Sequence, residues 1–234
     1  MRHAPHPIFT FINKIDRETK DPFDLVQELE DVLGLPSVPV TWPIGNGLNF
    51  EGIYDILKNE VHLYKAGKTI TLGEDGVFGP ELESEIAGYN LSALRDEIEL
   101  IQGAGNDFNM DLIAKGKLSP VFFGSALNNF GIELFLNYFL EMTSSPLPRM
   151  SDSGLIDTFS PDFSAFVFKI QANMDPKHRD RVAFMRICSG EFDAGMEVNH
   201  VQTGRKVKLS QPTQMMADER KIVEKAYAGD IIGI

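Results

Sequence analysis

The apolar positions of this chain include two short runs, at residues 7–12 and 118–123. Both runs are rich in β-branched and aromatic residues, as is typical of strands buried on both faces of a sheet. The first run stops at Asn13. We therefore expect two buried strands, the first of which ends directly before a polar loop.

A helical pattern follows each run. After the first, Asp21 is an N-cap before Pro22, and Gly34 ends the segment. The apolar residues between them fall three and four positions apart, at Leu25, Val26, Leu29, Val32 and Leu33. After the second, residues 131–142 predict a helix whose inward face consists of Ile132, Phe135, Tyr138 and Phe139. Alternating strands and helices predict a parallel α/β sheet.

The pattern loosens between the two strand–helix pairs, from about residue 39 to residue 117. Turn signals at 44–47 and 74–76 separate weak, short apolar runs. One clear helix is indicated there by Leu91, Leu94, Ile98 and Ile101. We interpret this part as an insertion into the α/β sheet and expect Trp42, beside Pro43, to anchor it.

The last third of the chain has a different organisation. Residues 146–160 begin with two prolines and continue as a polar stretch broken by Gly154, which predicts a linker. Residues 163–171 and 181–188 predict strands, and glycines at 190, 195 and 204 fall between further short runs. Closely spaced strands without helices predict a small antiparallel barrel, and we expect it to be incomplete because the chain ends inside an apolar run.

The composition limits the classes of function and partner that are possible. With 43% hydrophobic residues in 234 positions, the chain can bury one sizeable core or two modest ones. A net charge of -12 argues against binding of DNA or RNA through the overall field, so any RNA contact needs a local basic patch. The single cysteine, Cys188, fits a cytoplasmic protein, and we expect a packed, inert thiol. No apolar run approaches the roughly 18 residues that span a bilayer, so no membrane partner is expected.

Asn13, Lys14 and Asp16 stand where the first strand ends, which is where open α/β sheets bind ligands. A carboxylate has two acceptor oxygens, so Asp16 matches the N1–H and 2-amino donors of guanine, a pattern that adenine lacks. Lys14 would lay its apolar stem on the base, and Asn13 would tie the loop to neighbouring backbone and to the base edge. The spacing predicts a guanine-reading loop; the alternative is a solvated turn.

A second loop supports this interpretation. The second predicted strand ends in Gly124, Ser125, Ala126 and Leu127, whose small residues allow backbone amides to approach the guanine O6. Asn128 and Asn129 follow and are expected to cap the next helix. The two loops, in this order, resemble the fourth and fifth guanine-binding motifs of the GTPase superfamily.

The resemblance extends further, to the bacterial peptide chain release factor 3 family of translational GTPases. It is carried by residues 9–18, 41–45, 120–127 and, above all, 166–186, and covers nearly the whole chain. It implies an α/β fold in which residues 1–145 are the C-terminal half of a P-loop GTPase-type G domain with the insertion at about 39–117. Residues 146–160 would be the linker and residues 161–234 a partial β-barrel, the family's domain II.

The resemblance also implies a function. Family members are ribosome-stimulated GTPases that promote recycling of class I release factors after peptide release. The intact protein would then bind GTP or GDP with magnesium, and its partners would be the ribosome, class I release factors and ribosomal RNA by local contact. The guanine-binding residues implied here are Asn13, Lys14, Asp16, Ser125, Ala126 and Leu127.

The phosphate-binding half of such a site is not matched. A phosphate loop has glycines five positions apart before Lys and Ser or Thr, yet His62 stands where Gly67-Lys68-Thr69 needs its first glycine. Two matches to Asp-x-x-Gly, at 31–34 and 230–233, follow Asn13 although the family's motif precedes it. The phosphate and magnesium elements would lie upstream of Met1, so no catalytic residue or metal ligand is named here. We expect this chain alone to be inactive and to bind no nucleotide tightly.

Lys177, His178, Arg179 and Arg181 form the one dense basic cluster of the acidic chain. A solvated hairpin rim explains such a cluster, whereas the family implies contact with the ribosome. Two other functions stay open. One is another translational GTPase, such as elongation factor G, and the other is a stand-alone binding module that does not hydrolyse GTP.

Overall fold

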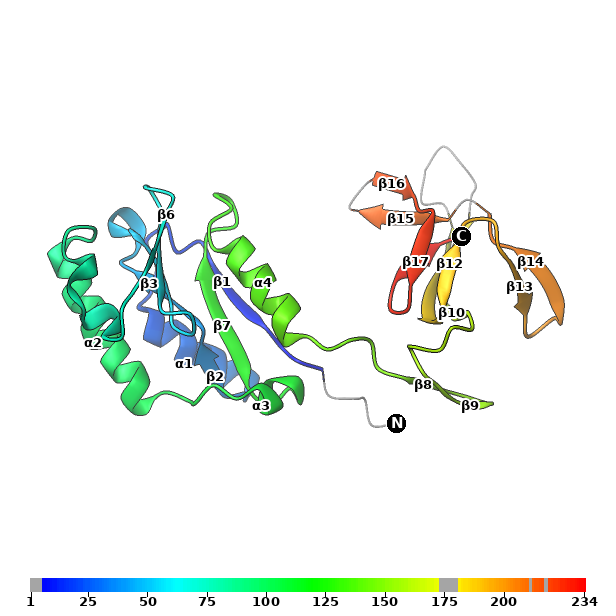
Figure 1. Ribbon diagram of the computed structural model, residues 1–234, viewed down its shortest axis with the longest axis horizontal. Coiled ribbons are helices and arrows are strands. Elements are labelled where there is room, and N and C mark those ends of the chain that lie inside the picture. Colours follow the sequence, from blue (N-terminus) through cyan, green and yellow to red (C-terminus); the bar gives the residue numbers. More distant parts are fainter. Residues whose placement is uncertain (1–5, 173–180, 211, 217–218) are drawn as a thin grey trace. The chain divides into compact units, whose positions relative to one another are not determined.

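The computed structural model describes residues 6–172, 181–210, 212–216 and 219–234. These residues form two compact units, Met1–Thr143 and Ser144–Ile234, which are described separately here. Helices occur only in the first unit among the described residues, and the second is built of strands (Figure 1). Within the described residues, no helix combines the length and the apolar character that crossing a membrane requires.

A three-stranded parallel sheet organises the first unit. Its order is β1 (Thr10–Asn13), β7 (Ser119–Gly124) and β2 (Ser37–Pro39), with both outer strands parallel to β7. Every residue of β7 is buried, as its apolar run predicts. The expectation of two-sided burial is wrong for β1, whose residues are half-buried or exposed because it lies at an edge of the sheet.

Helices cover both faces of this sheet. Phe123 of β7 lies in the cluster that includes Phe23, Val26 and Leu29 of α1 (Pro22–Leu33). Phe122 faces the other way, toward Tyr138 and Met142 of α4 (Ile132–Met142). The strand–helix alternation predicted from the sequence is therefore confirmed.

The ends of α1 follow its sequence signals. Asp21 Oδ1 accepts a hydrogen bond from the Phe23 amide at 2.8 Å, and Gly34 adopts φ 61° and donates its amide to Glu30. The inward face is smaller than predicted, because Val32 and Leu33 in the last turn are 75% and 51% exposed. Phe139 of α4 is likewise 40% exposed. Helical spacing predicts which side of a helix is apolar. The three-stranded sheet is too narrow to cover all of that apolar side.

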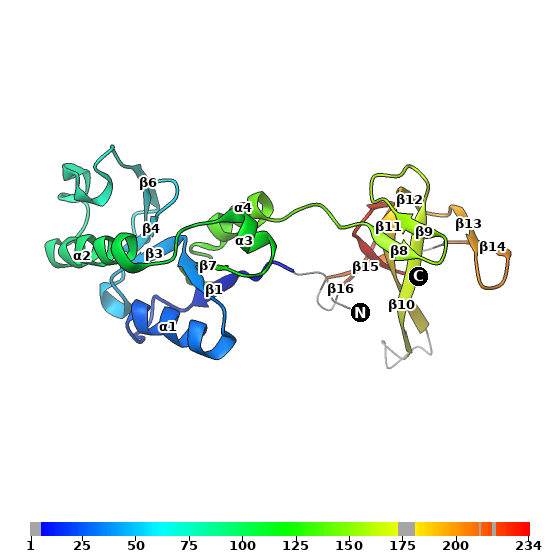
Figure 2. The same cartoon turned by 90° about the horizontal axis from the view of Figure 1, so that it is seen from below.

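The insertion contains an antiparallel sheet that the sequence pattern did not predict. Its strands, in order, are β3 (Thr41–Ile44), β4 (Gly52–Asp55), β5 (Glu60–Leu63) and β6 (Lys68–Thr71). Short 3-10 turns η1 (Gly47–Asn49), η2 (Gly76–Phe78) and η3 (Pro80–Leu82) and the helices α2 (Gly88–Ala104) and α3 (Met110–Ala114) complete it. The predicted helix is confirmed as α2, which lies beside β3 and buries Leu91, Leu94 and Ile98 (Figure 2).

Trp42 joins the insertion to the parallel sheet. Its side chain is fully buried, and its ring lies 4.7 Å from that of Phe23 and 5.4 Å from that of Phe123, centroid to centroid. The indole Nε1 donates to Glu97 Oε2 of α2 at 2.6 Å. Trp42 thus contacts α1, β7 and α2 together, and the expected anchor is confirmed.

The second unit consists of short antiparallel ladders. A sheet of five strands has the order β10 (Ser164–Ala172), β11 (Arg181–Ser189), β18 (Ile231–Gly233), β15 (Thr213–Met216) and β16 (Glu219–Ile222). Two-stranded ladders pair β12 (Glu191–Asp193) with β17 (Lys225–Tyr227) and β13 (Glu197–His200) with β14 (Arg205–Lys208). The ladders do not close into a ring within the described residues, so the unit is a partial barrel.

Side chains from these ladders share a small core of Met185, Ile187, Phe192 and Ile232. Cys188 is a buried free thiol, as expected. A hairpin of β8 (Arg149–Ser151) and β9 (Gly154–Ile156) occupies part of the predicted linker. Gly154 has φ 118°, a conformation that suits glycine in a tight turn, so this glycine belongs to a hairpin rather than to an irregular linker.

Asp55 and Tyr138 link the insertion to α4. Asp55 is fully buried, and its Oδ1 accepts from the amides of Leu57 and Lys58. The Tyr138 hydroxyl lies 2.7 Å from Oδ1 and 2.9 Å from Oδ2. Burial raises the pKa of Asp55 above its ordinary value, while the hydrogen bonds from Lys58 and Tyr138 oppose that rise. The carboxylate therefore depends on these donors when it is ionised.

We expect Tyr138→Phe to lower the free energy of unfolding by about 1–3 kcal/mol at pH 7, since it leaves a buried carboxylate short of a donor. The loss should be smaller at an acidic pH, because the raised pKa of Asp55 lets this carboxyl take up a proton more readily than an ordinary aspartate, and the donor then matters less. Urea denaturation at both pH values measures it, with exposed Tyr89→Phe as control. Equal losses at the two pH values would contradict this account.

Candidate functional site

The two predicted loops meet at the carboxyl ends of β1 and β7. The strands are paired in parallel through Asn13 opposite Gly124, so the residues that follow each strand leave the sheet at the same edge (Figure 1). Asn13 and Ala126 are 113 residues apart in sequence and are joined by a hydrogen bond. The structure therefore brings together the residues that the sequence placed in one site.

Asn13 ties the loops to each other. Its Oδ1 accepts from the Lys14 amide at 2.8 Å and from the Ala126 amide at 2.9 Å. Lys14 adopts φ 70°, a left-handed conformation that is uncommon for a residue with a side chain. This turn sends Ile15 into the core, where it is 1% exposed and its amide donates to Gly124 O at 3.2 Å.

Because Ile15 is buried, the next residue, Asp16, is held near the carboxyl edge of the sheet. Asp16 Oδ2 accepts from Asn128 Nδ2 at 2.9 Å. Its Oδ1 is buried and has no hydrogen-bond partner among the residues that the structure describes. A buried carboxylate oxygen without a donor is costly, which makes it a fit for a ligand that brings an N–H group.

The loop after β7 is held by its own backbone. Ser125 and Phe130 exchange two backbone hydrogen bonds, at 3.0 and 2.9 Å, which closes the loop between them. Ser125 is buried, whereas Ala126 and Leu127 are exposed at the tip, Leu127 to 78%. The tip of this loop is therefore exposed near Asp16, while the amides of Ser125 and Ala126 already donate to Phe130 O and Asn13 Oδ1.

The capping role expected of Asn128 and Asn129 is wrong. Helix α4 begins at Ile132 with Gly131 as its N-cap, and no side chain of the described residues caps it. Asn128 turns its amide to Asp16 and Ser125 instead, and Asn129 sits at φ 52°. The two asparagines lie too far before the first turn of the helix to reach its free amides.

The partial matches to phosphate and magnesium motifs have structural roles. Gly67, Lys68 and Thr69 belong to the β5–β6 hairpin, where Lys68 Nζ pairs with Glu85 at 2.5 Å. The match at 31–34 is the end of α1, and in the match at 230–233 Asp230 accepts the Tyr227 amide. None of these follows a parallel strand, as a phosphate loop requires.

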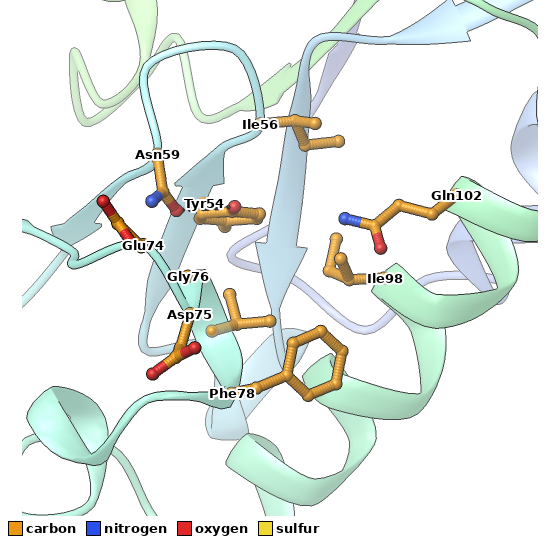
Figure 3. Close-up of a pocket in the computed structure, with 10 residues that line it drawn as sticks. Tyr54, Ile56, Asn59, Glu74, Asp75, Gly76, Phe78, Ile98 and Gln102 are labelled. Carbon is orange, nitrogen blue, oxygen red and sulfur yellow. Dashed lines mark hydrogen bonds between the residues drawn. The ribbon is translucent and has the colours of Figure 1, made fainter.

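A cavity of about 340 Å³ lies in the insertion, between the β4–β5 turn, η2 and α2 (Figure 3). The Tyr54 hydroxyl donates to Asn59 Oδ1 at 2.9 Å, and Asn59 Nδ2 donates to Gly73 O at 2.8 Å. Nearby, ligating atoms of Asp55, Glu60 and His62 lie within 4.8 Å of one another. Asp55 is already occupied by Tyr138 and two backbone amides, so we interpret both features as structural.

Only one residue of the predicted basic cluster lies within the described part of the chain. Lys177, His178 and Arg179 lie outside the described residues. Arg181 is exposed at the start of β11, opposite Ala172 of β10.

Residues 162–234 match the family described as Elongation factor G domain 2. The peptide chain release factor 3 of Symbiobacterium thermophilum is 54% identical over 97% of this chain and 44% of its own length. That of Streptococcus mutans serotype c is 51% identical over 100% of the chain and 45% of its own length. The chain is a homologue of peptide chain release factor 3. It spans less than half the length of these two relatives.

A solved structure supports the fold. A protein from Thermus thermophilus matches 97% of this chain and 34% of its own chain with a TM-score of 0.63, at 22% sequence identity. The similarity at this identity concerns the fold alone. The two relatives named above confirm the sequence resemblance to release factor 3. The α/β unit followed by a partial barrel agrees with the fold expected for it.

We expect Asn13→Ala to loosen the link between the two loops. The Ala126 amide loses its acceptor, so its hydrogen exchange should accelerate by about two- to tenfold, the effect of one neutral hydrogen bond. Exchange measured by NMR tests this, with exposed Asn137→Ala on α4 as control. Unchanged protection of Ala126 would show that the loops are held without Asn13.

Proposed function

We propose that this chain carries the guanine-reading half of the nucleotide site of a translational GTPase. In this proposal residues 1–145 belong to the G domain, with the insertion at about 39–117, and residues 161–234 belong to domain II. The intact protein binds GTP or GDP with magnesium, acts in the cytoplasm on the ribosome, and stimulates recycling of class I release factors. Homology to release factor 3 and to Elongation factor G domain 2 supports the class of protein.

One observation carries the proposal. Asp16 lies at the carboxyl edge of a parallel sheet, with one oxygen buried and unpartnered within the described part of the chain, and that edge is where open α/β sheets bind ligands. Guanine offers two adjacent donors, N1–H and the 2-amino group, and a carboxylate offers two acceptors. A base that donates through N1–H and its amino group therefore suits the two oxygens of Asp16.

The other site residues surround this pair. Lys14, in its left-handed turn, supplies an apolar stem for one face of the base. Ser125, Ala126 and Leu127 supply the backbone at the tip of the second loop, beside the guanine O6. Asn13 holds that tip to the first loop through the Ala126 amide. Phosphate and magnesium contacts come from elsewhere in the intact protein, and no step of hydrolysis is assigned to these residues.

We expect Asp16→Asn to invert the preference for the base. An amide supplies one donor and one acceptor, so it pairs with the xanthine 2-carbonyl and N1–H but mismatches the guanine amino group. The ratio of GDP to xanthosine diphosphate affinity should fall by at least about tenfold, because one hydrogen bond disappears and a polar group stays unpaired. Calorimetry on full-length protein that includes the phosphate-binding motifs measures both affinities.

If Asp16→Asn weakens both nucleotides equally, Asp16 only braces its loop and the proposal fails. Asp31→Asn is the matched control. This residue lies near the end of α1, away from the loops, and its side chain accepts from Gln27. It should leave both affinities unchanged.

The ribosome contact is tested separately. Reversing the charges of Lys177, Arg179 and Arg181 should weaken ribosome binding and make its salt dependence shallower, by about 0.7–0.9 in slope for each phosphate that is no longer neutralised. Reversal of Lys206, an exposed residue of β14 in the same unit, controls for net charge. Binding across a salt series that matches the native protein would refute this contact.

A further inference from the structure

Asn128 contacts the carboxylate to which the proposed function assigns base reading. Its Nδ2 lies 2.9 Å from Asp16 Oδ2 and 3.1 Å from Ser125 Oγ. A side-chain amide has two N–H donors, so one serves each acceptor. The backbone of Asn128 belongs to the loop after β7, whereas Asp16 belongs to the loop after β1, so this contact joins the loops a second time, next to the base-reading group.

The carboxylate of Asp16 keeps acceptor capacity beyond the contact with Asn128. A carboxylate oxygen has two lone pairs, so Oδ2 can accept from Asn128 and from a ligand together. Oδ1 receives no donor from any residue in the described ranges. The amide therefore restrains the rotation of the carboxylate without using up the acceptors that two adjacent ligand donors need.

We propose that Asn128 is a positioning residue for nucleotide selectivity: its amide holds Asp16 so that both oxygens face the base as acceptors. This inference rests on the proposed function, since it requires that Asp16 reads guanine. An amide nitrogen only donates, so it can be satisfied only by an acceptor on Asp16. With its nitrogen toward Asp16, Asn128 thereby fixes the orientation of the carboxylate and matches its acceptor oxygens.

Two substitutions separate these effects. Asn128→Ala removes the restraint and leaves Asp16 free to rotate. Asn128→Asp places a second carboxylate within hydrogen-bond distance of the first, so repulsion between like charges replaces the hydrogen bond. This repulsion should turn Asp16 away from the position in which both its oxygens meet the guanine donors.

The decisive experiment measures GDP and xanthosine diphosphate affinities of full-length native protein and these variants. Asn128→Ala should reduce the GDP preference by about three- to tenfold, less than the roughly tenfold to hundredfold effect of a hydrogen bond to a charged group, because Asp16 loses its restraint but keeps its own contacts with the base. Asn128→Asp should reduce it by at least about tenfold. Asn129→Gly is the matched control, since glycine accepts its φ of 52°, and should change the preference less than about twofold.

The outcomes distinguish the two proposals. If native protein prefers GDP and Asp16→Asn inverts that preference, but Asn128→Ala weakens both nucleotides equally or neither, Asn128 only closes its loop and this inference is wrong. If native protein shows no preference, or Asp16→Asn leaves it unchanged, the proposed function fails and this inference with it.

A second measurement needs no nucleotide. In the 234-residue chain, the side-chain amide resonances of Asn128 should shift on Asp16→Ala, while those of exposed Asn137 stay in place. Backbone amide spectra check that the variant keeps its fold. Asn128 resonances that do not respond to the loss of Asp16 would overturn the contact itself.

Discussion

The parallel pairing of β1 with β7 is the constraint on which the candidate site depends. The register places Ile12 opposite Phe123 and Asn13 opposite Gly124, so two loops from distant parts of the chain begin at the same level. A slip of one residue would turn Asn13 to the other face and separate its Oδ1 from the Ala126 amide. Register is strongly specified here because β7 is buried on both faces, with Phe122 and Phe123 in different clusters.

The insertion contributes to that register. It lies in sequence between the two strands, yet its Trp42 packs on Phe123 of β7 and on Phe23 of α1. Ile15, the residue between Lys14 and Asp16, enters the same cluster, and its carbonyl accepts the Gly47 amide from the turn after β3. The core of the insertion and the residues that hold the loop after β1 are therefore one apolar cluster, so the insertion stabilises the candidate site.

Features that depend on a few neighbouring residues could be predicted from the sequence. Asp21, Pro22 and Gly34 marked the ends of α1 because caps act over a few residues, and the apolar run of β7 marked a strand covered on both sides. The antiparallel sheet β3–β6 was not predicted, because its strands have four residues each and such short segments show no clear alternation of apolar and polar residues. The exposure of Val32 and Phe139 was also missed, since helical spacing does not reveal how much sheet lies opposite. The candidate site shows the same division: Asn13, Lys14 and Asp16 could be named from their order after a strand, since sheet topology places that position at a ligand-binding edge. The role of Asn128 could not, because asparagine close to a helix start resembles a cap, and only the tertiary approach of Asp16 redirects its amide.

The local geometry where β1 ends is energetically unfavourable at two points. Lys14 adopts a left-handed conformation at φ 70°, an energetic cost for a lysine, whereas asparagine tolerates the similar conformation of Asn129 at φ 52°. Asp16 Oδ1 is buried with no donor from the described residues. A loop selected for stability alone would use glycine at such turns and solvate or pair its carboxylate. The buried contacts of Trp42, Ile15 and Phe123 over-determine the fold around these positions, so the strain persists. The left-handed turn at Lys14 and the unpartnered oxygen of Asp16 both lie where β1 ends, and they support the proposed site, because a ligand that donates a hydrogen bond to Asp16 would offset a cost that the protein otherwise bears.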